Sequence, residues 1–165
     1  MTSHVEPLPP LLSLDIRAAG PRCRLLLGDL DGDGRMELVL VQPDNRQDVR
    51  YIPHQVGALT AFDLDGRLLW QVGRPSQDAG GPGSDYPAQI ADCDGDGRLE
   101  ALCVMDGRLL VLDGRSGRPK ASLPLPAPHA HDCIIPADLS GRGYSGEWLL
   151  KDRYRNVWAA DGSGR

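Results

Sequence analysis

The sequence predicts an all-β protein that forms part of a β-propeller, with blades of four antiparallel strands and about two and a half blades in all. Two observations lead to this fold class. Similar units recur along the chain, and the aspartates that mark them, Asp29, Asp92 and Asp138, lie 63 and 46 residues apart. Propeller blades repeat roughly every 40–50 residues. Each unit also contains apolar runs of about five to seven residues, which suit strands better than helices.

The first half of each unit is predicted to be a hairpin. An apolar run leads into an aspartate-headed loop, and a second apolar run follows the loop. A second hairpin comes next; in the second unit Asp106-Gly107 between two apolar runs is a strong turn signal. The third unit stops before its fourth strand. The expected single partial domain, 1–165, therefore divides into a blade at 23–73, a blade at 86–124 and a truncated blade at 132–165.

The longer spacing of the first unit requires inserted loops. The stretches Gln42–Gly57 and Arg74–Ser84 are polar or rich in glycine and proline, and both are expected to be such loops. A propeller closes with about 4–8 blades, so the predicted blades do not close one alone. The chain could be a fragment of a larger propeller, which we favour, a partial gene product, or a protomer that assembles with copies of itself. The expected partners are the remaining blades or another copy of the chain. The alternating run Leu12–Ile16 is expected to be an outer strand of a preceding blade.

Two nine-residue loops carry the pattern of calcium ligands. Each has carboxylates at positions one, three and five, a glycine at six and a glutamate at nine. Calcium prefers 6–8 oxygen ligands, and acids at alternate positions of a curled loop can all face one ion. Gly34 permits the left-handed backbone that such a turn requires. The expected ligands of the two Ca²⁺ ions are Asp29, Asp31, Asp33, the Arg35 carbonyl and Glu37 in the first loop, and Asp92, Asp94, Asp96, the Arg98 carbonyl and Glu100 in the second.

The loops differ from EF-hands, which carry an acid at position twelve between helices. Position twelve is Leu40 in one loop and Cys103 in the other, both in strand-like runs. The third loop places Arg142 at the third carboxylate position, so no metal is expected there, and the arginine is predicted to pair with Asp138. Calcium in the two complete loops is expected to stabilise the blades, with anion binding as the alternative role.

Composition excludes several other classes of protein. The arginines are scattered along the chain, which gives no nucleic-acid footprint. No run approaches the roughly 20 apolar residues of a membrane span. The four cysteines lack zinc or disulfide-framework spacing. Met1–Pro10 shows no signal peptide, so the compartment is left undetermined: cytoplasmic as the sequence is written, extracellular if the chain is a fragment.

Several segments give the chain a resemblance to known propellers. The calcium loops resemble those of FG-GAP-type β-propellers. From about residue 23 onward the chain is more closely similar to large-propeller rhamnogalacturonan lyases, on the strings Asp85–Ile90, Ala130–Ile135 and Leu149–Tyr154, with Asn156-Val-Trp158 after them. The resemblance implies β-elimination on an acidic plant polysaccharide. A base removes the proton α to a galacturonate carboxylate while a cation neutralises that carboxylate.

The resemblance suggests four catalytic candidates, each with a simpler structural role beside it. His131, Tyr154 or Lys151 would be the base, and Arg153, Lys151 or calcium the cation. In the simpler interpretation Lys151–Tyr154 is a strand end and turn with Arg153 paired to Asp152, and His131 begins a strand. Whether the chain is an enzyme stays undecided at this point. The alternative function is a calcium-stabilised interaction or adhesion module without catalysis.

Overall fold

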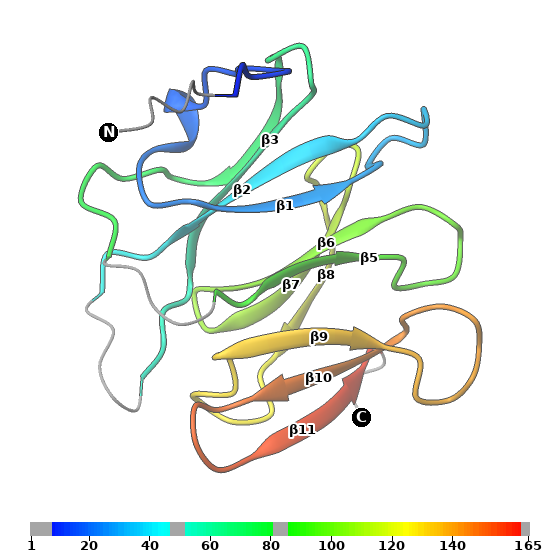
Figure 1. Ribbon diagram of the computed structural model, residues 1–165. Coiled ribbons are helices and arrows are strands. Elements are labelled where there is room, and N and C mark those ends of the chain that lie inside the picture. The colour runs from blue at the N-terminus through cyan, green and yellow to red at the C-terminus, as the bar shows by residue number, and fades with distance from the viewer. Residues whose placement is uncertain (1–7, 47–51, 81–85, 163–165) are drawn as a thin grey trace, which may run out of the picture.

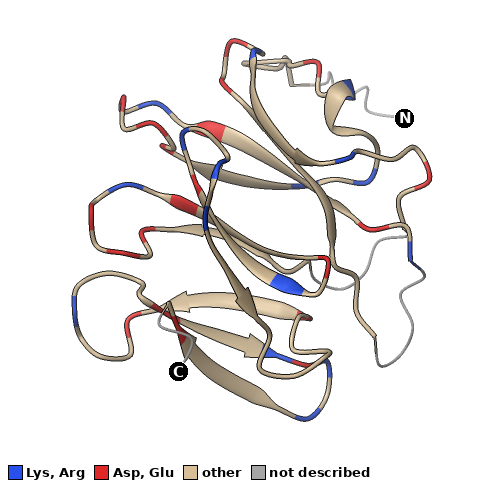
Figure 2. Cartoon of the chain, turned by 180° about the vertical axis from the view of Figure 1, so that it is seen from behind, with Lys and Arg blue, Asp and Glu red and all other residues tan. Residues whose placement is uncertain are grey.

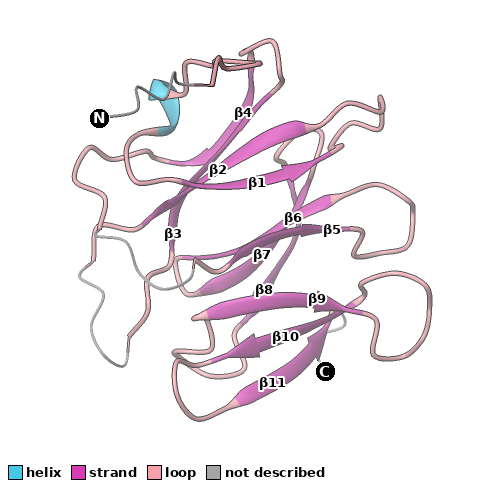
Figure 3. Cartoon of the chain, in the orientation of Figure 1, coloured by secondary structure: helices cyan, strands magenta, loops and turns pink. Residues whose placement is uncertain are grey.

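The computed structural model describes residues 8–46, 52–80 and 86–162 and has almost no helix. Its strands form three antiparallel sheets stacked side by side, one below another in the view of Figures 1 and 3. Sheet 1 has the order β1-β2-β3-β4, sheet 2 the order β5-β6-β7-β8, and sheet 3 the order β9-β10-β11. The prediction of four-stranded antiparallel blades in an incomplete propeller is confirmed, including the three-stranded third sheet.

The strand bounds follow the apolar runs closely. They are β1 Arg24–Gly28, β2 Glu37–Pro43, β3 Val56–Phe62, β4 Leu68–Gly73, β5 Ala88–Ala91, β6 Glu100–Met105, β7 Arg108–Asp113, β8 Pro119–Pro124, β9 Cys133–Ala137, β10 Glu147–Lys151 and β11 Val157–Asp161. Each sheet is a simple meander in which every strand pairs with the next one in sequence.

The core lies in two layers between the sheets. Sheets 1 and 2 enclose a cluster that includes Val39, Leu59 and Cys103, and sheets 2 and 3 enclose one that includes Leu102 and Trp148. The middle sheet is covered on both faces, so every residue of β6 is buried. This explains why its sequence is a continuous apolar run and not an alternating one.

Corresponding strands of neighbouring sheets lie side by side. β5 contacts β1 on one side and β9 on the other, so the first strand of each sheet occupies the inner edge of the stack. At the outer part of the stack, the Trp70 indole in β4 donates a hydrogen bond of 2.7 Å to the Gly114 carbonyl in the β7–β8 turn. The hairpin loop that follows each first strand therefore emerges at one common end of the sheets (Figure 1).

The structure corrects one strand prediction. Leu12–Ile16 forms no strand, and a single 3₁₀ turn, η1 (Arg17–Ala19), follows it. Ala19 instead packs with Leu40 and Phe62 on the outer face of sheet 1. Parts of both predicted loop insertions, residues 47–51 and 81–84, lie outside the described residues, as do Met1–Pro7. Among the described residues no helix is long and apolar enough to cross a membrane.

Candidate functional site

The first aspartate-rich loop, between β1 and β2, gathers three carboxylates. Asp29, Asp31 and Asp33 each bring an oxygen within 4.8 Å of the others. The backbone holds this arrangement: the Asp29 carboxylate accepts the N–H groups of Gly32 at 2.8 Å and Gly34 at 3.0 Å. Both glycines have left-handed φ angles, 79° and 86°, which other residues adopt only at a cost. The sequence analysis recognised this need only at Gly34.

The second loop, between β5 and β6, repeats the main hydrogen bonds of the first. Oxygens of Asp92, Asp94 and Asp96 also lie within 4.8 Å of one another. The Asp92 carboxylate accepts the Gly95 N–H at 2.7 Å and the Gly97 N–H at 3.0 Å. Figure 2 shows acidic residues concentrated in both loops at the same end of the sheets. Such sets of hard oxygens fit calcium better than softer metals.

The position-nine glutamates hold the loops closed from the start of the next strand. Glu37 is buried, and its Oε2 accepts the Leu30 N–H at 2.7 Å. Glu100 does the same for the Cys93 N–H at 2.8 Å. Neither glutamate belongs to the three-aspartate cluster of its loop. Their role as direct ligands therefore stays a prediction, as does that of the position-seven carbonyls.

The backbone N–H and guanidinium groups of the arginines at position seven contact nearby aspartates. The Arg35 N–H donates to Asp33 at 2.7 Å, and its guanidinium pairs with Asp65 at 3.3 Å. Arg98 pairs with Asp96 at 2.8 Å. Both arginine side chains are largely exposed.

A lysine distinguishes the second loop from the first. Lys120 in β8 reaches Asp94 at 2.6 Å and Glu100 at 2.8 Å. Burial opposes its charge, but the hydrogen bonds and charges of these two carboxylates raise the pKa of Lys120 above its ordinary value. In the first loop the chief influence on Glu37 is burial, which raises its pKa, and the nearby aspartates raise it further. Negative charge is therefore less compensated in the first loop.

The third loop, between β9 and β10, keeps the same backbone with a different charge. Asp138 accepts the N–H groups of Arg142 and Gly143, both at 2.7 Å. The Arg142 guanidinium pairs with Glu147 at 2.5 Å, and not with Asp138 as the sequence analysis expected. Both oxygens of Asp138 accept backbone N–H groups, while Glu147 takes the direct contact with the guanidinium. Ser140 also donates to Glu147, at 2.5 Å.

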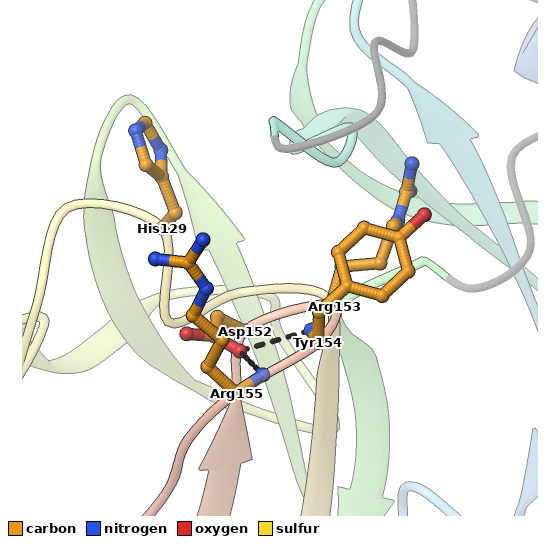
Figure 4. Close-up of a pocket in the computed structure, with 5 residues that line it drawn as sticks. All are labelled: His129, Asp152, Arg153, Tyr154 and Arg155. Carbon is orange, nitrogen blue, oxygen red and sulfur yellow. Dashed lines mark hydrogen bonds between the residues drawn. The ribbon is translucent and has the colours of Figure 1, made fainter.

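A pocket lies at the opposite end of sheet 3. It has a volume of about 230 Å³ and is lined by His129, Asp152, Arg153, Tyr154 and Arg155. Figure 4 shows the β10–β11 turn on one side of this pocket and His129, from the β8–β9 connection, on the other. The Asp152 carboxylate accepts the N–H groups of Tyr154 and Arg155, which hold the turn and lower the pKa of Asp152.

The predicted catalytic residues divide into two groups. Arg153 and Tyr154 line the pocket, and the Tyr154 side chain is largely exposed. Lys151 and His131 do not line it. His131 is buried, its Nε2 lies 3.2 Å from the Pro53 carbonyl, and burial lowers the pKa of His131.

Buried Asp132 links the two predicted cationic residues. It pairs with Lys151 and, at 3.0 Å, with the Arg153 Nε. The expected Arg153–Asp152 pair is therefore wrong: Asp132, 21 residues away in sequence, takes that place. The sequence analysis missed His129 and Arg155. The cationic residues on both sides of Tyr154 were the available signal for Arg155.

Comparison with known proteins rests on structure alone. No family model matches the sequence, and no curated protein matches it. The exotype rhamnogalacturonan lyase YesX superposes with a TM-score of 0.55 at 20% identity, over 86% of this chain and 31% of that one. The rhamnogalacturonan lyase YesW gives 0.48 at 21% identity, over 84% of this chain and 34% of that one. The chain thus spans about a third of either protein, and the likeness to YesX is one of fold.

Proposed function

We propose that this chain is a calcium-binding segment of a β-propeller related to the rhamnogalacturonan lyases. The observation that carries the proposal is the pair of matched aspartate clusters on neighbouring sheets, in a fold that resembles that of YesX. Two Ca²⁺ ions would offset most of the net charge of −5. Each ion would bridge the three aspartates of its loop and so tie a first strand to its neighbour.

The proposed calcium has a structural role. The aspartate loops and the pocket at the β10–β11 turn lie at opposite ends of the strands (Figure 1). An ion held in those loops cannot touch a ligand in that pocket. Of the three cations considered for neutralising a substrate carboxylate, calcium in these loops is therefore the least suitable.

The pocket supports an acidic polysaccharide as ligand. Arg153, Arg155 and His129 offer N–H donors around one small cavity, and guanidinium groups match the geometry of carboxylates. In a β-elimination the base would take the proton α to the uronate carboxylate, the bond from the β carbon to the glycosidic oxygen would break, and that oxygen would leave with a proton. Tyr154 is the one of the three predicted bases that lines the pocket. Buried His131 is poorly placed for this role.

Ultraviolet absorbance tests the lyase proposal, because elimination produces unsaturated uronates. We expect absorbance to rise when the protein meets rhamnogalacturonan in calcium, and Tyr154→Phe and Arg155→Gln to slow the rise at least about tenfold. Arg118→Gln is the matched control, since Arg118 is an exposed arginine in the turn between β7 and β8. An unchanged absorbance with wild-type protein would contradict catalysis.

A non-catalytic, calcium-stabilised interaction module is the second candidate. The observation in its favour is that Asp132 pairs with both Lys151 and Arg153, which reduces the positive charge available to a substrate. This function predicts calcium-dependent stability and polysaccharide binding without turnover. Calorimetric binding of rhamnogalacturonan together with unchanged absorbance would favour this candidate over the lyase.

A further inference from the structure

Sheet 3 has an open outer edge. β3 and β7, the third strands of sheets 1 and 2, each pair with a fourth strand, whereas β11 pairs only with β10 among the described residues. Beside β11 lies an apolar groove of about 430 Å³, lined by residues of β8, of β11 and of Leu125–Pro126. Leu123, Trp158 and Ala160 are among its lining residues. An unpaired strand edge beside an apolar groove is a template for another strand.

The face of sheet 3 that points away from sheet 2 is also uncovered. Val157 in β11 corresponds to Leu59 in β3 and Leu109 in β7. Each of these residues pairs with the fifth residue of the second strand of its sheet. Leu59 is 0% and Leu109 2% exposed, but Val157 is 64% exposed. Ile135 in β9 is exposed as well, at 50%. In sheets 1 and 2 the next sheet covers the corresponding face.

Sheet 1 presents the complementary face at the other end of the stack. Leu25 and Leu27 of β1 are more than half exposed. Their register counterparts in sheet 2, Ala88 and Ile90, pack against sheet 1. The β1 part of the outer face of sheet 1 is therefore built like a face that receives a neighbouring sheet, while Ala19 covers Leu40 and Phe62 further along that face.

The exposed run Leu12–Ile16 has the place in chain order of a fourth strand. Seven residues separate it from β1, and eight separate the fourth strand β8 from β9. Apolar Leu12, Leu14 and Ile16 alternate with polar residues, as in a half-buried strand. Leu12 is 50% and Ile16 38% exposed, so the run has apolar surface to bury.

This run cannot complete sheet 3 of its own chain. η1, which begins at the next residue, contacts β2 and β3 on sheet 1. β11 lies two sheets away, about 20 Å at the usual spacing of packed sheets. One residue advances the chain by at most about 3.6 Å. The run therefore cannot reach the β11 edge of its own molecule in this structure, whereas the same edge of a second copy is not subject to this limit.

We propose that two copies of this chain pair head to tail. Leu12–Ile16 of one copy adds to the edge of β11 in the other and fills the groove beside it. The same arrangement brings the Leu25 and Leu27 face of the first copy onto the Ile135 and Val157 face of the second. A two-fold axis makes this heterologous contact twice, once at each end of the stack. The three sheets of one copy and the three sheets of the other then close a ring of six blades, within the range of about 4–8 blades that propellers use.

Light scattering coupled to size-exclusion chromatography, in calcium and over a concentration series, tests the proposal. We expect twice the chain mass of 17.8 kDa for the wild-type protein. We expect one chain mass for Leu12→Asp/Ile16→Asp and for Ile135→Asp/Val157→Asp, with unchanged far-ultraviolet circular dichroism. Because the four residues are 38–64% exposed, these substitutions remove only part of the packing of each side chain. Ser13→Asp, between Leu12 and Leu14, is the matched control and should retain the double mass.

Mixing the two double variants tests the direction of the contact. A head-to-tail interface leaves one intact contact between them, so the mixture should regain the double mass at concentrations where each variant alone does not. A wild-type protein of one chain mass, or of more than two, would overturn the proposal. So would a double mass for Leu12→Asp/Ile16→Asp, because the added strand would then be unnecessary.

Discussion

The two aspartate-rich loops and the third loop share a backbone but differ in the charge that balances their carboxylates. In every loop the leading aspartate, Asp29, Asp92 or Asp138, accepts backbone N–H groups. The Arg142 guanidinium lies beside Glu147 in the third loop, whereas the first holds a cluster of three aspartates. The comparison teaches that the same hydrogen bonds to the first aspartate and the last glutamate recur in all three hairpins, whether position five holds an aspartate or an arginine.

The second loop is intermediate between the other two. It keeps the three aspartates and adds Lys120 beside two of its carboxylates. The pKa shifts of the closing glutamates agree with a decrease in uncompensated negative charge from the first loop to the third. Burial raises the pKa of Glu37 in the first loop, while hydrogen bonds from Ser140 and Leu139 and the pair with Arg142 lower that of Glu147 in the third. The loops should therefore differ in how far calcium stabilises them.

Calcium removal should have the largest effect. An ion present at a hundred times its Kd contributes about 2.7 kcal/mol, and for a chain of this size that corresponds to about 5–10 °C in Tm. We expect chelator to lower the Tm by at least about 5 °C, and Asp31→Ala/Asp94→Ala to abolish this response. Ser140→Ala changes the same position of the third loop and should retain it. A melting curve that chelator leaves unmoved would contradict the role of the first two loops.

Restoring the carboxylates of the third loop should turn it into a calcium site. Ser140→Asp/Arg142→Asp gives this loop acids at positions one, three and five. We expect calorimetry to count one more ion per chain than in wild-type protein. The calcium-free variant should melt below wild type, because Glu147 loses its cation and gains like charges nearby. A count that stays at the wild-type value would show that the aspartates alone do not define the site.

Removing Lys120 should make the second loop more like the first. Lys120→Met takes away a cation that competes for Asp94 and Glu100, so the calcium affinity of the second loop should rise about three- to tenfold. Terbium luminescence titration would resolve the change, with the first loop as an internal reference. Arg118→Met removes the same charge from an exposed position and should leave both affinities unchanged.

The smallest effect should appear in the pH dependence of calcium-free protein. The pKa of Glu37 in the folded protein is raised above its ordinary value of 4.5. The contribution of Glu37 to folding stability is therefore present below pH 4.5 and is lost as the pH rises through the raised pKa. Glu37→Gln should then raise stability at neutral pH, by up to about 1 kcal/mol. Glu147 has a lowered pKa, so its contribution is present above the ordinary value and is lost on acidification. Glu147→Gln should destabilise at neutral pH. Urea unfolding at pH 4 and pH 7 would compare the two, and equal responses would contradict the assignment.

Local patterns predicted most of the fold. Short apolar runs and aspartate or glycine turns fix hairpins between neighbours in sequence, and all three sheets are built from such hairpins. The failure at Leu12–Ile16 has a physical reason. Alternation predicts a strand, but a strand also needs an edge to pair with, and among the described residues this run pairs with no strand of its own chain.

The candidate sites were less predictable where partners are distant in sequence. The aspartate triplets lie within nine residues and could be read directly. Asp132 and Arg153 meet only because β9 and β10 pair, so the sequence favoured the neighbouring Asp152 instead. His129 enters the pocket from a separate connection for the same reason. Buried His131 likewise meets a distant segment, since its Nε2 lies beside the Pro53 carbonyl in the β2–β3 connection.

The number of calcium ions bound per chain tests the central comparison most directly. Equilibrium dialysis of wild-type protein followed by elemental analysis should give two ions. Asp31→Ala/Asp94→Ala should give none, and Asp138→Ala, in the third loop, should still give two. A wild-type count of zero would contradict calcium binding, and a count of two that survives Asp31→Ala/Asp94→Ala would place the metal elsewhere in the molecule.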